Sequence, residues 1–178
     1  MKLVQLSRDA LLKPLQAVTG IVERRHTLPI LSNVLIQREP ENLRFVATDL
    51  ELQIATSCAM DKKAGESMAV TVSARKLVDI LRALPEDSEA VLEAANNRLQ
   101  VKAGKSRFNL QTLPAADFPT LADPGKALSA FQIPQGKARS LLALVQYAMA
   151  QQDIRYYLNG LLLVTEDKEI RVVATDGH

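Results

Sequence analysis

The chain has 178 residues, of which 47% are hydrophobic, 24% are charged and 4% are aromatic, and it carries a net charge of +2. These proportions are ordinary for a globular protein with an aliphatic core. The single cysteine, Cys58, excludes an intrachain disulfide framework. No secretory signal and no apolar run of the ~18 residues that span a membrane is visible, so we expect a protein of the reducing cytoplasm with no membrane partner.

The residue pattern in the first part of the chain predicts a strand, a helix and further strands. Residues 4–6 form a short strand, and Ser7 begins a helix over residues 7–19, because a serine hydroxyl can accept a hydrogen bond from a free backbone N–H. Apolar and polar residues alternate at 52–55, which predicts another strand. Cys58 is expected to serve as a small hydrophobic side chain in a strand.

The same order of elements recurs in the next part of the chain. A strand at 70–72 leads to Ser73, and a helix over 73–84 places apolar residues at i, i+3, i+4 and i+7 from Leu77, which forms one stripe facing a sheet. Turn residues stand at 96–97 and 104–105. Since Ser7 and Ser73 are 66 residues apart, we predict two β-α-β-β-β half-copies, with antiparallel sheets and helices on one face, in an α+β fold.

A longer repeat divides the chain into two domains. Asn33 matches Asn159 at an offset of 126, and the Thr-Asp pair at 48–49 matches the pair at 175–176 at an offset of 127. A period this long indicates a duplicated domain. The Pro-rich stretch 112–126 predicts a loop and a linker. We therefore expect a complete first domain over 1–125 and the beginning of a second over 126–178, with a strand at 130–133 and a helix at 135–151.

Charge is distributed unevenly among these elements. The three predicted helices carry two acidic residues, Asp9 and Asp79, against seven basic ones: Arg8, Lys13, Arg75, Lys76, Arg82, Lys137 and Arg139. The remainder of the chain is acidic on balance. Basic helices on an acidic scaffold indicate one face that meets a polyanion; the alternative is that solvated helix faces carry this charge by chance.

Signals for catalysis are weak. The chain has two histidines, His26 and His178, and none of the motifs HExxH, CxxC, GxSxG or the P-loop. Asp49 and Asp176 are equivalent in the repeat, but each ends a strand and can bond the backbone of its own turn. We therefore predict no catalytic residue, no metal site and no cofactor; a hydrolase that uses these aspartates and His178 is the alternative.

Two loops offer contacts for a polyanion. Residues 23–26 read Glu-Arg-Arg-His after the first helix, and the segment 151–157 ends in Tyr156 and Tyr157. Paired tyrosines can stack on bases, or one of them lies in the core and the other on the surface. Because no helix-turn-helix, zinc-finger or RNA-recognition signature is present, the expected contact is with the phosphate backbone and independent of sequence.

Six motifs in order identify a family resemblance. They are Lys13-Pro14-Leu15, the segment Thr-Leu-Pro-Ile-Leu at 27–31, Ser106-Arg107-Phe108, Thr-Leu-Pro-Ala-Ala-Asp-Phe-Pro at 112–119, Arg-Tyr-Tyr-Leu-Asn-Gly at 155–160 and Ala-Thr-Asp-Gly-His at 174–178. Together they resemble the bacterial DNA polymerase III beta subunit, the replication sliding clamp. The resemblance covers the whole chain.

The resemblance implies a DNA-clamp fold, in which two subunits of three similar domains each form a ring with basic helices lining the hole and sheets outside. Such a homodimer catalyses nothing; it encircles double-stranded DNA and tethers the DNA polymerase III catalytic subunit. The other partners implied are the clamp loader and proteins with short clamp-binding peptides, which occupy a hydrophobic cleft between the second and third domains.

Matching positions of this chain follow from the same resemblance. Those implied to face DNA are Arg25, Arg75, Gln152, Tyr156 and Tyr157. Those implied to line the peptide cleft are Leu158, Thr175, Gly177 and His178. Those implied to form the dimer interface are Lys76, Ile80, Leu84, Arg107, Phe108 and Leu110, with Phe108 expected to be an outward-facing apolar strand residue.

Chains of the family continue beyond the position that matches His178. We therefore expect an N-terminal fragment that cannot close a ring and has only part of the cleft. Uncovered strand edges and apolar surface after residue 126 should then cause aggregation, pairing with another copy or poor order. The alternative is a short clamp-like DNA-binding or decoy module that forms no ring and competes with the full clamp.

Overall fold

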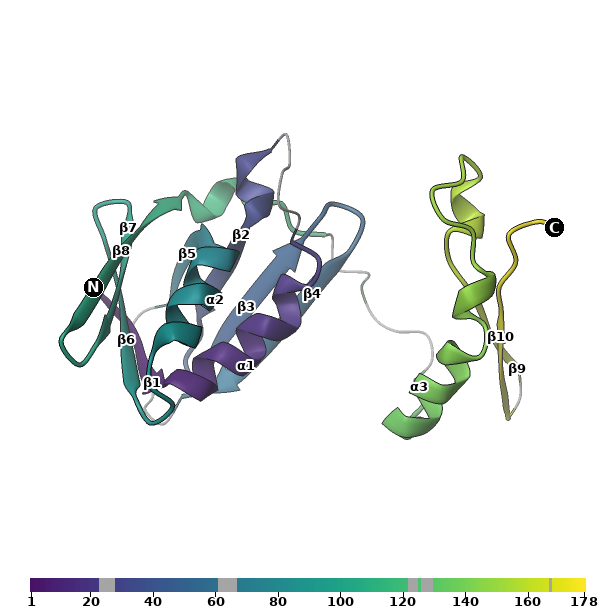
Figure 1. Ribbon diagram of the computed structural model, residues 1–178, viewed down its shortest axis with the longest axis horizontal. Helices are drawn as coiled ribbons and strands as arrows, with labels where there is room; N and C mark the ends of the chain where they lie inside the picture. The colour runs from purple at the N-terminus through teal and green to yellow at the C-terminus, as the bar shows by residue number, and fades with distance from the viewer. Residues whose placement is uncertain (23–27, 61–66, 122–124, 126–129, 167) are drawn as a thin grey trace. The chain divides into compact units, whose positions relative to one another are not determined.

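Figure 1 shows the computed structural model of the chain, which describes residues 1–22, 28–60, 67–121, 125, 130–166 and 168–178. The chain divides into two compact units, and each is described by itself. Unit 1 is Met1–Asp123 and unit 2 is Pro124–His178.

Unit 1 contains two successive sets of strand, helix and three strands, as the sequence predicts. The first set is β1 (Lys2–Ser7), α1 (Arg8–Thr19), the short 3-10 helix η1 (Pro29–Ser32), β2 (Asn33–Arg38), β3 (Asn42–Thr48) and β4 (Gln53–Ala59). The second set is β5 (Met68–Ser73), α2 (Ala74–Ala83), β6 (Glu89–Ala95), β7 (Arg98–Ala103), β8 (Ser106–Leu113) and the 3-10 helix η2 (Ala115–Asp117).

The two sets exchange their first strands. The eight strands form one antiparallel sheet in the order β1-β6-β7-β8-β5-β2-β3-β4, so that β1 pairs with β6 of the second set and β5 pairs with β2 of the first. The two halves are joined through β5 and β8, whose register contains only the pairs Thr71–Leu113 and Val72–Thr112. The exchange joins the two halves within the compact unit Met1–Asp123.

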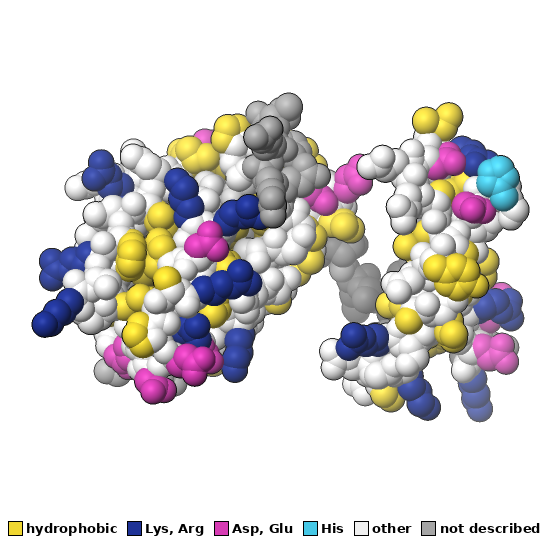
Figure 2. Space-filling view, viewed as in Figure 1, with side chains coloured by type: hydrophobic (Ala, Val, Ile, Leu, Met, Phe, Trp, Pro, Cys, Tyr) yellow, Lys and Arg dark blue, Asp and Glu magenta, His cyan; other side chains and the backbone are white. Residues whose placement is uncertain are grey.

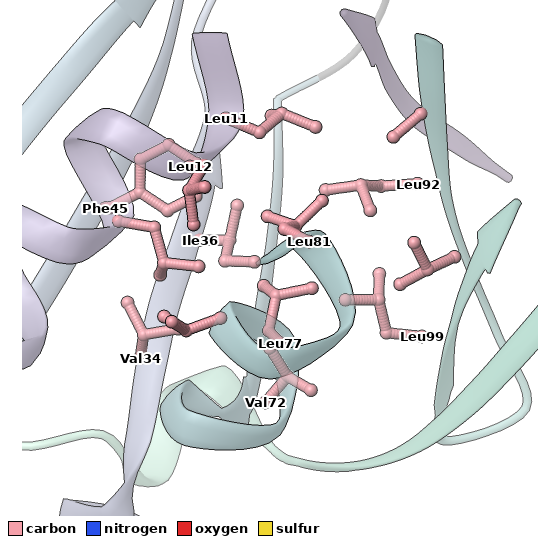
Figure 3. Packing of buried hydrophobic residues seen from close by; sticks show 14 of the residues in the cluster. Leu11, Leu12, Val34, Ile36, Phe45, Val72, Leu77, Leu81, Leu92 and Leu99 are labelled. Carbon is pink, nitrogen blue, oxygen red and sulfur yellow. The ribbon is translucent and has the colours of Figure 1, made fainter. Parts of the chain in front are cut away.

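Helices α1 and α2 lie side by side on one face of this sheet (Figure 1). Figure 3 shows the aliphatic core between helices and sheet. It contains Leu11 and Leu12 from α1, Leu77 and Leu81 from α2, and Val34, Ile36, Phe45, Val72, Leu92 and Leu99 from the strands. The predicted stripe of α2 is confirmed, because Leu77, Leu81 and Leu84 are buried and Ile80 packs half-buried against the core.

Three polar contacts fix the helices on the sheet. The Ser7 hydroxyl accepts a hydrogen bond from the Ala10 N–H at 3.3 Å and caps α1 as predicted. The Thr56 hydroxyl on β4 donates to the carbonyl of Pro14 at 2.9 Å. Arg8 donates from Nε to the carbonyl of Leu81 at 3.0 Å, so the first residue of α1 satisfies a carbonyl at the end of α2.

Cys58 lies half-buried in β4, where it packs against the core. Burial raises the pKa of its thiol above the ordinary value, which keeps the side chain neutral. Its Sγ lies 3.8 Å from the carbonyl oxygen of Leu43. The environment is that of a small hydrophobic side chain, as expected.

Unit 2 contains one α-helix and one hairpin among its described residues. The elements are α3 (Gln135–Ala143), the 3-10 helices η3 (Gln146–Ala148) and η4 (Tyr156–Leu158), and the strands β9 (Leu162–Glu166) and β10 (Glu169–Val173). The predicted helix over 135–151 is therefore too long, and 130–133 forms no strand. The helix ends early because Val145 has a φ of −122°, outside the helical region.

The side chains of unit 2 are not enclosed. None of its described residues is buried, and Leu142, Leu162, Leu163 and Val173 are among its exposed hydrophobic side chains. Within the described part of the chain, β9 and β10 pair only with each other. The uncovered apolar surface and strand edges predicted for this region are present, and an edge of this kind can pair with another chain.

The repeat extends to the hydrogen bonds of a turn. In unit 1, the Leu50 N–H donates to the Thr48 hydroxyl and the Glu51 N–H donates to Asp49 Oδ1. In unit 2, the Gly177 N–H donates to the Thr175 hydroxyl and the His178 N–H donates to Asp176 Oδ1. The third residue of each turn has a positive φ, +82° at Leu50 and +90° at Gly177. Both copies thus use one turn design, which suits glycine better than leucine.

Leu50→Gly is expected to stabilise unit 1. A left-handed backbone costs a leucine roughly 1–2 kcal/mol, and the added chain entropy of glycine returns part of this, so the free energy of unfolding should rise by about 0.5–1 kcal/mol. Leu50 is 45% exposed, so little apolar burial is lost. Urea unfolding measures the change. The matched control, Leu52→Gly, has no positive φ to relieve and should lower stability by about 0.5–1 kcal/mol; destabilisation by both variants would show that Leu50 is unstrained.

Candidate nucleic-acid interface and partner surfaces

The outward face of α1 and α2 is rich in basic side chains. Figure 2 shows Lys and Arg side chains spread over this face, with acidic side chains gathered mainly along its lower edge. The basic residues of the two helices are Arg8, Lys13, Arg75, Lys76 and Arg82, all within the helices as predicted. A surface of this charge attracts a polyanion.

Two of these cations also hold the helices together. Arg8 bonds the carbonyl of Leu81 and forms an ion pair of 2.8 Å with Asp9. Arg82 donates to the side-chain oxygen of Gln16 from Nη2 at 3.0 Å and from Nε at 3.1 Å, with the Gln16 amide oriented to suit its neighbours. Charge counting treats all five cations alike, whereas in the structure Arg8 is half-buried and Lys13, Arg75, Lys76 and Arg82 are exposed, with Lys13 3.9 Å from Asp9.

A groove of about 410 Å³ lies where α2 begins and α1 ends. Its lining includes three cations and one acid, namely Arg75, Lys76, Arg82 and Asp79, together with Thr19, Val22, Ser32, Ser73, Ala74 and Val78. Among the described residues, no side chain caps the first N–H groups of α2, and the Ser73 hydroxyl makes no capping bond. Free N–H groups and the helix dipole favour negative charge at this end.

Three of the other residues matched to DNA-facing positions lie in unit 2. Arg25 is outside the described residues, together with the rest of the 23–27 segment. Gln152, Tyr156 and Tyr157 belong to unit 2, and all three are exposed. The tyrosine rings pack edge to face with centroids 5.9 Å apart, and they are 83% and 68% exposed, so neither is a core residue. Exposed rings of this kind can stack on bases or lie against sugars.

The four residues matched to the peptide cleft belong to two adjacent segments of unit 2. Leu158 ends η4 and is half-buried, while Thr175, Gly177 and His178 form the exposed turn described above. Arg155 links the segments, because its Nη2 donates to the carbonyl of Asp176 at 3.3 Å. The same guanidinium holds both oxygens of Asp153, with Nε–Oδ1 at 3.1 Å and Nη2–Oδ2 at 2.8 Å.

This ion pair predicts an unusually acidic carboxyl group. Side-chain and backbone hydrogen bonds from Arg155 lower the pKa of Asp153 from 3.8 to about 2. Because the folded pKa is lowered, the contribution of the pair is present above the ordinary value of 3.8 and is lost as the pH falls through about 2. An NMR carboxyl titration should give a midpoint near 2. In Arg155→Gln the midpoint should return towards 3.8, and a wild-type midpoint already near 3.8 would contradict the pairing.

The residues matched to a dimer interface lie on α2, on β8 and just after α2. Lys76 and Arg107 are exposed, and Ile80 and Phe108 are half-buried, whereas Leu84 and Leu110 are 7% and 8% exposed and belong to the core. The expectation that Phe108 faces outward is wrong. Its strand partner is the buried Val101, so its ring points to the core side of the sheet. It stays partly exposed because it lies near an open sheet edge.

That edge belongs to β8. Residues Ser106–Gln111 pair with β7, and β8 meets β5 only at Thr112 and Leu113. Among the described residues, the backbone of 106–111 therefore has a strand neighbour on one side only. An edge of this kind is suited to pairing with another chain.

Each of the two repeat-equivalent aspartates bonds the backbone of its own turn. Asp49 Oδ1 accepts hydrogen bonds from the N–H groups of Glu51 and Leu52, and Asp176 accepts one from the N–H of His178, as expected for turn residues. No group of three potential metal ligands occurs in the described part of the chain. Nor does any helix there have the length and apolar character required to cross a membrane.

Known families match almost all of the chain. Residues 1–122 match the family described as DNA polymerase III beta subunit, N-terminal domain, and residues 132–178 match its central domain. The Beta sliding clamp of Pseudomonas aeruginosa is 50% identical over 173 residues, which cover 97% of this chain and 47% of that protein. That of Escherichia coli K12 is 47% identical over the same shares. The chain spans about half the length of these relatives.

Solved structures agree with the sequence matches. The DNA polymerase III subunit beta of P. aeruginosa has a TM-score of 0.93 at 49% identity and covers all of this chain, which spans 48% of that structure. A P. aeruginosa clamp bound to griselimycin has a TM-score of 0.90 at 49% identity, covering 98% of this chain and 47% of the other. These matches and the two half-copies of the fold place the chain in the DNA polymerase III beta subunit family, the non-catalytic sliding clamps of DNA replication.

Proposed function

We propose that this chain is the N-terminal part of a ring-shaped processivity factor. In this proposal residues 1–125 are a complete first domain and 126–178 begin a second. The ring, a homodimer of full-length subunits, encircles double-stranded DNA in the cytoplasm and tethers the DNA polymerase III catalytic subunit. The observation that carries the proposal is the basic face of α1 and α2 on a fold that belongs to the sliding-clamp family.

The charge distribution suits a protein that slides. Arg75 and Lys76 are exposed on the face that carries the two helices, and the acidic Asp79 lies in the same groove. Phosphate contacts of this kind are independent of sequence and exchange readily. A protein that must move along DNA needs attraction without one preferred register, so a few mobile cations serve it better than base-reading side chains.

The open edge of β8 supports a subunit interface. Arg107 and the half-buried Phe108 lie on this edge, and Lys76 and Ile80 lie on α2, which contacts the same strand. In a ring, the third domain of the partner subunit would meet this surface. Backbone pairing would supply orientation, and the apolar side chains would supply buried area.

Partner peptides are proposed to meet unit 2. Leu158 and the turn with Thr175, Gly177 and His178 would supply one wall of the cleft, and the clamp loader and the polymerase would share it. A P. aeruginosa clamp of this fold binds griselimycin, so a small-molecule or peptide site on such a clamp has a precedent.

Retention on circular DNA tests the proposal. The protein purified from its own cells is loaded onto nicked circular DNA by its clamp loader, and bound protein is counted before and after the circle is linearised. A ring should remain bound to the circle and leave the linear DNA. Equal loss from both forms, together with competition against a full-length clamp, would instead support the decoy module.

A further inference from the structure

The turn at Thr175–His178 accepts a hydrogen bond from Arg155, which forms an ion pair with Asp153. Neither residue is among the four matched to the cleft. We infer that Asp153 and Arg155 form a positioning pair, which holds this turn in the single backbone arrangement that clamp partners meet. The inference rests on the proposed cleft and adds to it the residues that fix its geometry.

The contacts of Arg155 reach both segments. Its guanidinium binds the two Asp153 oxygens in a fork at 3.1 and 2.8 Å, and its backbone N–H donates to Asp153 Oδ1 at 2.8 Å. From this fixed position Nη2 reaches the carbonyl of Asp176 at 3.3 Å. A bidentate fork fixes orientation as well as distance, which a single point charge does not. The carboxylate therefore aims the guanidinium at the turn.

Asp153 is itself held from two sides. Its N–H donates to the side-chain oxygen of Asn159 at 3.0 Å, and its carbonyl accepts from Asn159 Nδ2 at 2.9 Å. Asn159 directly follows Leu158, one of the proposed cleft residues. The segment 153–159 is thus a closed loop on which Arg155 and Leu158 have fixed relative positions.

Gly177 leaves the space that Arg155 occupies. A Cβ at this position would lie 2.9 Å from Arg155 Nη1 and 3.3 Å from Nη2, closer than atoms can pack without moving. The residue also has a φ of +90°, which glycine tolerates. The guanidinium therefore packs directly against the backbone of the turn. A side chain at this position would have to displace the guanidinium.

Comparison with the first copy of the repeat shows that the turn can form without an arginine. The turn of unit 1 has the same two side-chain bonds, but it is closed by hairpin bonds from the Asp49 N–H and the Thr48 hydroxyl to the carbonyl of Leu52. Counting back 126 or 127 residues from Arg155 gives Pro29 or Leu28, neither of which is charged. The arginine is therefore a property of the second copy and not of the turn design.

The first experiment measures how well ordered the turn is. Amide hydrogen exchange at Gly177 and His178 is compared in wild type, Arg155→Lys and Asp153→Asn. We expect exchange about two- to fivefold faster in both variants, the range that an exposed ion pair supplies. Amides of the β9–β10 hairpin should be unchanged. Unchanged exchange at the two turn amides would overturn the inference.

The matched control is another pair of the same spacing in the same unit. Arg171 Nη2 lies 3.8 Å from Glu169 Oε2, also two residues apart and exposed, and it lies on β10 away from the turn bonds. Arg171→Lys should leave Gly177 and His178 unaffected. Faster exchange at the turn in this control as well would mean that any charge change loosens unit 2, and the assignment to Arg155 would fail.

Binding of griselimycin provides a second readout. It distinguishes the existence of the proposed cleft from the positioning of the turn by Asp153 and Arg155. Griselimycin is titrated into the full-length form of each protein, which contains the whole proposed cleft, while the Gly177 and His178 amide resonances are followed. Shifts in wild type with an affinity about tenfold weaker in Arg155→Lys, and unchanged in Arg171→Lys, support positioning of a binding surface. Equal affinity in Arg155→Lys despite a looser turn overturns it. Absence of binding to wild type counts against the proposed cleft, whereas the exchange result still decides whether the pair holds the turn.

Discussion

Replacing Leu77 by alanine should lower the free energy of unfolding of unit 1 by about 3–4 kcal/mol. Leu77 is fully buried at the centre of the cluster in Figure 3, between α2 and the strands of both halves. Because the exchanged strands β1 and β5 tie the halves together, the core cannot collapse locally to fill the space. The lost transfer free energy and the residual cavity therefore both contribute. Urea unfolding followed by far-UV circular dichroism measures the effect.

Leu142→Ala is the matched control, since it makes the same change on a helix of unit 2. Leu142 is 40% exposed, so we expect a change within about 0.5 kcal/mol. Tyrosine fluorescence helps to separate the units, because the three tyrosines, Tyr147, Tyr156 and Tyr157, all lie in unit 2. Leu77→Ala should shift the circular dichroism transition without shifting the fluorescence. Equal destabilisation by the two variants would contradict the placement of the core in unit 1.

Arg75→Glu should weaken binding to duplex DNA about tenfold at about 50 mM salt and reduce the slope of log affinity against log salt by about 1 or more. The reason is that Arg75 is exposed in the groove at the start of α2, where Lys76 and Arg82 already supply positive charge. The loss should be the same for any DNA sequence, because no base is read. Fluorescence anisotropy with two unrelated duplexes, each titrated across a range of salt, measures it.

Arg98→Glu makes the same charge change on the opposite side of the sheet. Arg98 is exposed on β7 next to the buried Leu99, whose side chain points to the helices. Since successive strand residues face opposite sides, Arg98 faces away from α1 and α2. Its substitution should leave the salt slope unchanged. A loss as large as that of Arg75→Glu would mean that net charge, and not the helix face, attracts DNA.

Local patterns in the sequence predict most elements of unit 1. Ser7 caps α1, Leu77 begins the buried stripe of α2, and the Asn96–Asn97 pair forms the two-residue hairpin turn with φ of +50° and +55°. Each of these signals depends on neighbours within one or two turns of chain. The β-α-β-β-β order of both halves follows from them.

The features that sequence patterns miss depend on distant contacts. The exchange of β1 and β5 is a matter of partner choice, which alternation within one strand does not encode. Arg8 counts as a free cation in the sequence, but it bonds the carbonyl of Leu81, 73 residues away. The early end of α3 has no glycine or proline to mark it. The sequence signal for Asp153 and Arg155 is a charge difference between the two copies of the repeat. Arg155 has no charged counterpart at the equivalent positions of the first copy.

Mapping of DNA-induced chemical shifts shows which face of unit 1 meets DNA. Spectra of the isotope-labelled chain are recorded with two duplexes of unrelated sequence, and the shifted amides are assigned to elements. We expect the shifts in unit 1 to concentrate on α1 and α2, in the same pattern for both duplexes and reversibly with salt. Shifts concentrated on the β6–β7 hairpin, or patterns that differ between the two sequences, would contradict a helix face that holds DNA without reading it.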